Sequence, residues 1–320
     1  MIKYLYRHDK DYSRYNIIKA LLKDVKCAKD VYILLPFSKN QFFKNFFKRD
    51  KIVNDFFISN YDTYVYDRQK ISKYNPRAWW KYFQDFINFR FSKYILSDTQ
   101  AHFDYWEKLF GKFSGNHFVL PVLADKQIYF PSKEQNENKI VEVLFYGSFI
   151  PLHGIDVILK AFKILEDENI VFKAKIIGNG QMFKSMQNLY NSLELKQVQM
   201  DGKLIDEQKL ANEIRKTNIV LGVFGNSTKA HSVVPNKVYQ ALACAKPLIT
   251  MQSDAIDEFF LREDLIQCEN TPKELASMIK LLIENNDTRQ RLSEHGYKHF
   301  LRLYDKTQKN FEQFVCSVGK

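Results

Sequence analysis

The chain has 320 residues, enough for two domains of ordinary size, and a globular composition with 45% hydrophobic and 27% charged residues. It contains no apolar run of about 18 residues, which excludes a membrane-spanning helix, and no Cys-x-x-Cys pair that would indicate a zinc or redox motif. The net charge of +11 is uneven, because residues 1–130 hold 23 Lys/Arg against 13 Asp/Glu while the rest is nearly balanced. The basic first half predicts an anionic partner, which could be a membrane surface, a nucleic acid or an acidic substrate.

Four widely separated cysteines, Cys27, Cys244, Cys268 and Cys316, show no pairing motif. We therefore expect reduced thiols, as is usual for a cytosolic protein. With no signal peptide in the sequence, a cytoplasmic location is expected.

The first half alternates helical patterns with short apolar runs, as an α/β domain does. The predicted strands are residues 2–6, 31–36, 64–66, 94–96 and 117–123. The predicted helices are residues 15–26, 37–51, 77–91 and one that begins with capping residues at 97–100.

The segment from Phe37 to Lys51 is read as one amphipathic helix. Its stripe of Phe42, Phe43, Phe46 and Phe47 is surrounded by five Lys or Arg residues. Two interpretations stay open: the stripe packs on the core, or the helix lies on an anionic bilayer.

A polar stretch at residues 131–139 predicts an interdomain linker. The second half then alternates strands and helices regularly. The predicted strands are residues 141–146, 172–177, 198–200 and 265–268, with one further strand that begins at 219 and another that ends at 250. The predicted helices are 155–166, 181–192, 207–217, one that starts at Pro235, 272–284 and two more before the C-terminus. This alternation is typical of parallel βαβ units in a Rossmann-like sheet.

Residues 219–250 form the centre of this half: a buried strand, a polar loop with Lys229, a helix that starts at Pro235-Asn236-Lys237, and a second buried strand. The N–H groups of a helix start and two lysines predict an anion site, typically for phosphate.

Glycines follow other strands of the same predicted sheet, at Gly147, at Gly178-Asn179-Gly180 and at Gly225. Ligands of such sheets bind beyond the carboxyl ends of the strands, so we expect a glycine-lined, cationic crevice that faces the other domain and binds a diphosphate. The sequence lacks the Gly-x-Gly-x-x-Gly, P-loop and Gly-x-Ser-x-Gly motifs of NAD enzymes, P-loop NTPases and serine hydrolases.

These segments resemble the bacterial glycosyltransferases of the GT-B fold, family-4 type. The resemblance lies in Gly147 with Pro151-Leu152-His153-Gly154, in Gly178-Asn179-Gly180-Gln181, in Lys229, in Pro235-Asn236-Lys237-Val238-Tyr239-Gln240 and in Glu258. It covers about residues 141–260 well, and the first half only loosely, at Asp98-Thr99-Gln100-Ala101-His102.

The resemblance implies two Rossmann-like domains with parallel sheets that face a cleft: an acceptor-side domain at residues 1–131, a nucleotide-sugar-binding domain at 140–301, and a helix at 302–320 that crosses back to the first domain. It implies sugar transfer from a nucleoside-diphosphate sugar to a surface-polysaccharide or lipid-linked acceptor, with retention and without a metal. If the segment 37–51 contacts a bilayer, we expect the protein on the inner membrane face.

The resemblance also assigns residues to roles. Lys229 and Lys237 would stabilise charge on the leaving diphosphate. The donor would contact Gly147, His153, Gly154, Gly178, Gly180, Asn236, Gln240 and Glu258. Where many members carry two glutamates, this chain has Ser232 and Gln240. A catalytically impaired sugar-nucleotide or glycolipid binder is therefore the alternative, while nucleic-acid binding has no motif in its favour.

Overall fold

The computed structural model describes residues 1–7, 12–132 and 140–319. Most of the predicted linker, residues 133–139, lies outside this range. The chain divides into two compact units. The first comprises Met1–Leu123, Ser232–Val234 and Leu303–Lys320, and the second Ala124–His231 and Pro235–Arg302.

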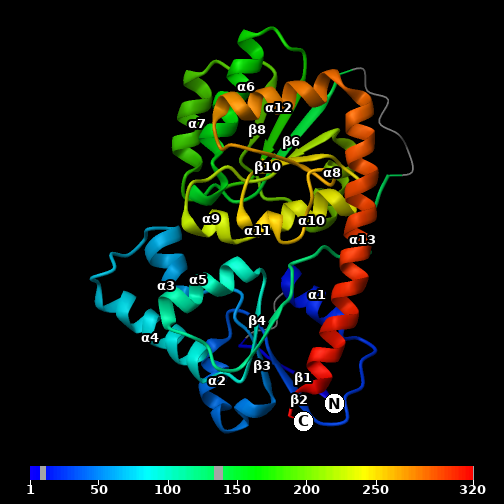
Figure 1. The fold of residues 1–320 in the computed structure, drawn as a ribbon. Helices are drawn as coiled ribbons and strands as arrows, with labels where there is room; N and C mark the ends of the chain where they lie inside the picture. Colours follow the sequence, from blue (N-terminus) through cyan, green and yellow to red (C-terminus); the bar gives the residue numbers. More distant parts are fainter. Residues whose placement is uncertain (8–11, 133–139, 320) are drawn as a thin grey trace. The chain divides into compact units, whose positions relative to one another are not determined.

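The first unit is built on a sheet of five parallel strands in the order β1-β2-β3-β4-β5 (Figure 1). Its strands are β1 Ile2–Leu5, β2 Val31–Leu34, β3 Ile52–Asp55, β4 Tyr94–Ser97 and β5 Asn116–Val119. Its helices are α1 Ser13–Leu21, α2 Lys39–Lys44, the 3-10 helix η1 Phe46–Lys51, α3 Asn60–Asp62, the π-helix η2 Thr63–Asp67, α4 Pro76–Phe91 and α5 Gln100–Phe110. The predicted α/β pattern of this half is confirmed.

The core of the first unit is aromatic. Phe56, Phe89, Trp106 and Phe110 are buried together, and the rings of Phe56 and Trp106 lie 4.8 Å apart edge to face. Large rings bury much apolar area per residue, which explains how a domain with strands of only four residues is stable.

The strand predicted at residues 64–66 is wrong, because Thr63–Asp67 forms a π-helix. It follows α3, whose first turn is capped by the Ser59 hydroxyl on the N–H of Asp62 at 3.0 Å. The third strand is instead Ile52–Asp55, where all four residues are buried. Only two of these four residues are apolar, so the strand carries little hydrophobic signal.

The single helix predicted over residues 37–51 is also wrong, because α2 ends at Lys44 and η1 starts at Phe46. The phenylalanine stripe divides accordingly: Phe42 is buried against the strands, whereas Phe47 is fully exposed. Neither open interpretation of this segment therefore holds for the whole stripe.

The second unit is built on six parallel strands in the order β11-β10-β9-β6-β7-β8. Its strands are β6 Glu142–Tyr146, β7 Lys173–Ile177, β8 Val198–Asp201, β9 Ile219–Leu221, β10 Leu248–Met251 and β11 Ile266–Cys268. Its helices are the 3-10 helix η3 Pro151–His153, α6 Ile155–Asp167, α7 Phe183–Ser192, α8 Glu207–Lys216, α9 Thr228–Ser232, α10 Asn236–Ala243, α11 Asp254–Asp257 and α12 Pro272–Glu284. Helices α6, α7 and α12 lie on one side of the sheet (Figure 1).

The final helix α13, Asn286–Ser317, is continuous over 32 residues, so the prediction of two separate helices is wrong. Gly296 lies within it, and a Cβ there would come 2.6 Å from Leu242 and 2.7 Å from the Asp264 carbonyl. This glycine allows close packing against the second unit and does not break the helix. From Leu303 onward the chain belongs to the first unit.

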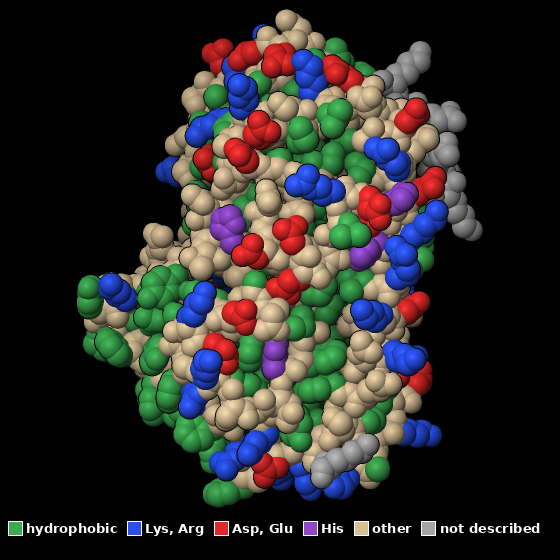
Figure 2. Space-filling view, viewed as in Figure 1, with side chains coloured by type: hydrophobic (Ala, Val, Ile, Leu, Met, Phe, Trp, Pro, Cys, Tyr) green, Lys and Arg blue, Asp and Glu red, His purple; other side chains and the backbone are tan. Residues whose placement is uncertain are grey.

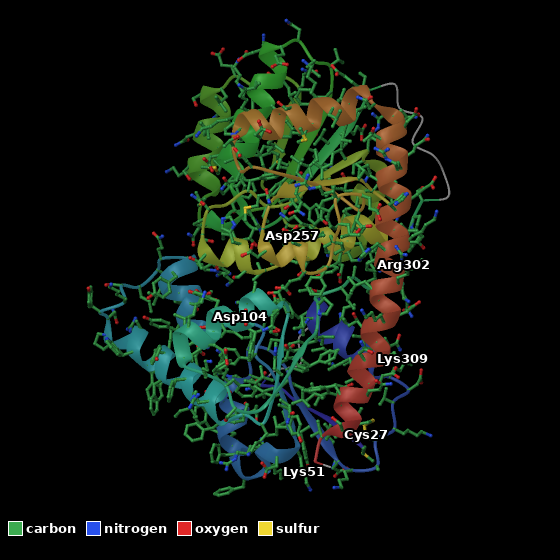
Figure 3. All side chains as sticks on the ribbon, viewed as in Figure 1. Cys27, Lys51, Asp104, Asp257, Arg302 and Lys309 are labelled. Atoms are coloured by element: carbon green, nitrogen blue, oxygen red, sulfur yellow. A yellow bond between two sulfur atoms is a disulfide. The ribbon has the colours of Figure 1, made fainter. Side chains whose placement is uncertain are left out.

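Cys27 and Cys316 form a disulfide, 289 residues apart in sequence, which corrects the expectation of reduced thiols for this pair (Figure 3). Cys244 and Cys268 are free and buried. The bond joins the segment before β2 to the end of α13, both within the first unit.

In the parts of the chain that the structure describes, no helix combines the length and apolar character needed to cross a bilayer.

Candidate functional site

Glycines allow the loops after β6 and β7 to pack directly on each other. A Cβ on Gly178 would lie 1.9 Å from the Gly147 carbonyl oxygen, and one on Gly180 would lie 2.6 Å from the backbone nitrogen of Phe149. Gly147 and Gly178 share a φ of +145°, a conformation that side chains disfavour. These glycines bring two adjacent strand ends into backbone contact.

A second pair of glycines joins the loop after β6 to the segment after β9. A Cβ on Gly154 would come within 2.2 Å of the Phe224 carbonyl, and one on Gly225 within 2.4 Å of the Leu152 carbonyl. The N–H of Phe224 also donates to the carbonyl of His153 at 3.1 Å. The loops after β7, β6 and β9 thus form one packed edge at the carboxyl ends of neighbouring strands.

Three of the predicted site residues converge at this edge. A Cβ on Gly147 would lie 2.8 Å from the Cε1 atom of His153 and 3.3 Å from the Nζ atom of Lys237. Gly147 follows β6, His153 ends η3, and Lys237 is the second residue of α10. The missing side chain at Gly147 therefore makes room for two basic groups from separate elements.

Lys237 is buried, with only 4% of its surface exposed. Its Nζ donates to the Gly222 carbonyl at 3.3 Å and lies 4.0 Å from the centroid of the Phe145 ring. Burial lowers the pKa of Lys237 well below its ordinary value. The aromatic face and one carbonyl compensate only partly for lost hydration, and among the described residues no acidic side chain forms an ion pair with this ammonium.

His153 is held in a defined orientation beside this lysine. Its Nδ1–H donates to the Ser148 carbonyl, and its ring meets the Phe145 ring edge to face at 5.7 Å. Burial and then the nearby charge of Lys237 lower the pKa of His153 well below its ordinary value. An anion between these two groups would raise both pKa values, so that both groups would be more fully protonated.

Gln240 is engaged by two tyrosines. The Tyr146 hydroxyl donates to its Oε1 atom at 2.9 Å, and its Nε2 atom donates to the Tyr129 hydroxyl at 2.9 Å. Tyr129 in turn donates to Glu207 at 3.2 Å. The amide at this position therefore ties α10 to β6 and to the segment before the second sheet.

The remaining predicted residues lie on other elements. Lys229 was expected in a loop but lies in the short helix α9, half-buried. Asn236 begins α10 and is half-buried, whereas Glu258 follows α11 and is exposed. Ser232, at the end of α9, belongs to the first unit, where its carbonyl accepts from the Thr99 hydroxyl at 2.5 Å.

Sequence reasoning missed the aromatic partners of this site. The Phe145 ring makes a cation–π contact with the ammonium of Lys237, and Tyr146 and Tyr129 form hydrogen bonds with the Gln240 amide. The only available signal was the position of Phe145 and Tyr146 directly before Gly147, at the end of a predicted strand.

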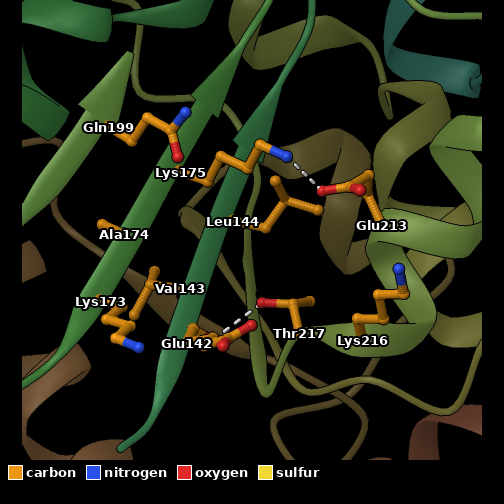
Figure 4. A pocket seen from close by; sticks show the side chains of 10 residues that line it. All are labelled: Glu142, Val143, Leu144, Lys173, Ala174, Lys175, Gln199, Glu213, Lys216 and Thr217. Atoms are coloured by element: carbon orange, nitrogen blue, oxygen red, sulfur yellow. Dashed lines mark hydrogen bonds and ion pairs between the residues drawn. The ribbon is translucent and has the colours of Figure 1, made fainter. Parts of the chain in front are cut away.

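A separate cavity of about 200 Å³ lies over the opposite part of the same sheet (Figure 4). It is lined by Glu142, Val143 and Leu144 of β6, Lys173 to Lys175 of β7, and residues of β8 and α8. Lys175 reaches across to Glu213 at 2.5 Å. Because it borders the starts of β6 and β7, this cavity is distinct from the glycine edge.

The chemistry of the glycine edge suits an anion. Two buried basic groups, Lys237 and His153, meet next to the first turn of α10, whose N–H groups carry partial positive charge. In the described ranges, no three His, Cys, Asp or Glu side chains gather as metal ligands would.

The sequence model of the group 1 glycosyl transferases matches residues 125–299, just over half of the chain. The chain is 29% identical over 180 residues to the uncharacterized glycosyltransferase MJ1178 of Methanocaldococcus jannaschii, a match that covers 55% of this chain and 46% of that protein. The chain spans about half the length of the curated relatives that it matches.

Solved structures show the same fold at low identity. Sucrose-phosphate synthase of Thermosynechococcus elongatus is 12% identical with a TM-score of 0.68, covering 89% of this chain and 72% of that one. HepE of Anabaena, solved in complex with UDP, is 11% identical with a TM-score of 0.66 and covers 99% of both chains. The predicted fold class, α/β with two parallel sheets as in GT-B glycosyltransferases, is confirmed.

Proposed function

Because the chain belongs to the group 1 glycosyl transferases, we propose that it transfers a sugar from a nucleoside-diphosphate sugar to a surface-polysaccharide or lipid-linked acceptor. We assign it to the family-4 type, with retention of configuration and without a metal. UDP and glucose in the structure of Anabaena HepE support a nucleotide-sugar donor. The family match over residues 125–299 supports donor binding in residues 140–301, which leaves residues 1–131 for the acceptor.

The observation that carries the proposal is the convergence of Lys237 and His153 at Gly147. Transfer requires the bond between the sugar and the diphosphate to break, so negative charge grows on the departing phosphate oxygens. A buried ammonium close to those oxygens stabilises this charge far more than a solvated one does. The diphosphate would in turn supply an anion for Lys237, which forms no ion pair with any acid of the described residues, and the contact would stabilise both the lysine and the diphosphate.

The roles of the other residues follow from this placement of the donor. Asn236 would present the helix start of α10 to the diphosphate, and Lys229 would add charge from α9. Gly154, Gly178 and Gly180 would act by shaping the loops around the donor. Glu258 would contact the sugar or ribose, as the family resemblance suggests.

We place the protein in the cytoplasm, on the inner membrane face when it meets a lipid-linked acceptor. The segment 37–51 supports this placement, since Phe43 and Phe47 are exposed next to Lys44 and Lys48.

The first test is a thermal-shift screen against nucleoside diphosphates and their sugars, because a ligand stabilises the state that it binds. The second is Lys237→Ala, which should reduce transfer by about a hundredfold or more while the protein still folds. Lys246→Ala is the matched control, since burial also lowers the pKa of Lys246 but this lysine follows the other end of α10. Unchanged turnover in Lys237→Ala would refute the proposal.

A catalytically impaired binder is the second candidate, and Gln240 favours it. The family pattern has glutamate at this position, whereas here an amide is occupied by Tyr146 and Tyr129. An assay of donor hydrolysis and transfer separates the two functions. Stabilisation by a donor without any turnover would establish the binder.

A further inference from the structure

The first unit exposes a group of large aromatic side chains on and just before α4. Monomeric proteins seldom expose contiguous apolar patches of this kind unless the patch binds something. The exposed fractions are 77% for Tyr74, 63% for Trp79, 61% for Trp80, 52% for Phe83 and 47% for Phe91. Figure 2 shows hydrophobic side chains gathered over the side of the first unit where Figure 1 places α3 and α4, with Lys or Arg among them.

These residues share one face of a well-anchored helix. Trp80, Phe83 and Phe91 follow helical spacing, and the rings of Trp80 and Phe83 lie 6.2 Å apart. The opposite face is fixed by the buried Asp85, which accepts from Lys39, from the Ser59 hydroxyl at 2.7 Å and from the Tyr61 N–H at 2.8 Å. The aromatic face is therefore exposed on a helix whose other side is firmly packed.

The charge along this part of the chain is mostly positive. Residues 68–93 contain seven Lys or Arg and a single acid, Asp85, which is buried in its ion pair with Lys39. Lys73, Arg77 and Arg90 are exposed. An aromatic face bordered mainly by cations matches a surface that is apolar inside and anionic outside.

The exposed residues of α2 and η1 extend the same face. The rings of Phe46 and Phe91 lie 6.0 Å apart, which places η1 beside the end of α4. Phe47 is fully exposed there, and Phe43 is 38% exposed. The aromatic surface thus continues from Tyr74 to Phe47 within the first unit.

We propose that this surface, the α4 docking face (Tyr74, Trp79, Trp80, Phe83 and Phe91 with Lys73, Arg77 and Arg90), binds an anionic lipid bilayer. Tryptophan and tyrosine favour the boundary between headgroups and acyl chains, and the cations pair with the headgroups. The helix lies in the plane of the membrane and does not cross it. The inference rests on the proposed function only for the biological role of docking, which would bring the enzyme to a lipid-linked acceptor.

The tryptophans report this docking directly. The chain has three, and Trp106 is fully buried, so a change in emission on binding comes from Trp79 and Trp80. Vesicles of phosphatidylcholine and phosphatidylglycerol in equal parts, with brominated phosphatidylcholine chains, should shift the emission to the blue and quench it. Vesicles of phosphatidylcholine alone should bind about tenfold or more weakly, because the cations lose their partners.

Two double variants separate the apolar and the charged contributions to vesicle binding. Trp80→Ser with Phe83→Ser, and Lys73→Gln with Arg77→Gln, should each weaken vesicle co-sedimentation about tenfold or more. The matched controls lie in the second unit: Leu204→Ser, at a residue 80% exposed, and Lys196→Gln with Lys203→Gln, both exposed. Controls and variants should melt at the wild-type temperature, since every changed side chain is on the surface.

Three results would overturn the inference. The first is that the wild-type protein fails to bind anionic vesicles, and the second is that the Trp80/Phe83 variant binds them as well as wild type does. The third result is that the α4 docking face instead mediates self-association or binds single-stranded RNA. Sedimentation velocity and RNA titration distinguish the last case. Lys237→Ala should still bind vesicles, and the α4 variants should still be stabilised by a nucleoside diphosphate. Failure of docking is thereby distinguished from failure of the proposed transfer.

Discussion

The Nζ atom of Lys237 lies 4.0 Å from the centroid of the Phe145 ring, in a position that is almost closed to solvent. Beside a ring and a single carbonyl, the ammonium form is poorly stabilised, and the pKa of Lys237 falls well below its ordinary value. An unfavourable charge of this kind is common where binding or catalysis needs it. The position that we propose for the diphosphate is therefore one where the buried lysine lowers the stability of the ligand-free protein.

Replacement of Lys237 by methionine should raise the stability of the ligand-free protein by about 1–3 kcal/mol near pH 7, because a buried base is exchanged for an apolar chain of similar shape. The folded pKa lies below the unfolded value, so the unfolded state binds the extra proton and wild-type stability rises with pH. The gap between variant and wild type should close as the pH approaches 10.5, the ordinary pKa of lysine. Urea unfolding across this range measures it, and a variant less stable than wild type would contradict the burial argument.

Nucleoside-diphosphate binding should take up protons near neutral pH. His153 and Lys237 both have lowered pKa values, and a diphosphate next to them would raise both. Calorimetry in two buffers with different ionisation enthalpies detects this uptake as a difference in the apparent binding enthalpy. His153→Gln should reduce the difference, while equal enthalpies for wild type in both buffers would show that neither base changes its protonation.

The second unit could be predicted well because its signals are local. Apolar runs ending at Gly147 and Gly178 and a helix start at Pro235-Asn236-Lys237 each occupy a few adjacent residues. Parallel strands then bring those ends to one edge, so the meeting of Gly147 and Lys237 follows from topology. The burial of Lys237 could not be predicted, because it depends on Phe145 of β6 and on Gly222, which follows β9.

The errors share a non-local cause. The four residues of β3 carry too short a pattern to outweigh the alternation at Tyr64–Tyr66, and their strand pairing with β2 and β4 decides the structure. Cys27 and Cys316 are 289 residues apart, and no spacing rule connects them. The sequence around Gly296 does not show why a glycine stands there, but its close contact with Leu242 explains why this long helix needs one.

Two glycines with equal backbone strain should respond differently to alanine. Gly147 and Gly178 both have a φ of +145°, but the added Cβ meets side chains at Gly147 and backbone at Gly178. Gly178→Ala should lower the free energy of unfolding by about 3 kcal/mol or more, since the Gly147 carbonyl cannot yield easily. Gly147→Ala should cost less stability but weaken transfer about a hundredfold, because it displaces His153 and Lys237. Chemical denaturation with a transfer assay tests the pair, and equal destabilisation would refute the distinction.

Disulfide Cys27–Cys316 should stabilise the chain by about 2–5 kcal/mol, because it closes a loop of nearly the whole chain and so restricts the unfolded state. Cys27→Ser with Cys316→Ser should therefore unfold at lower urea concentration than wild type, and dithiothreitol should destabilise wild type but leave the variant unchanged. Native protein should show no rapidly reactive thiol, since burial raises the pKa values of Cys244 and Cys268 to about 12. Two thiols should become reactive after mild reduction. Two reactive thiols before reduction would show that the bond is absent in solution.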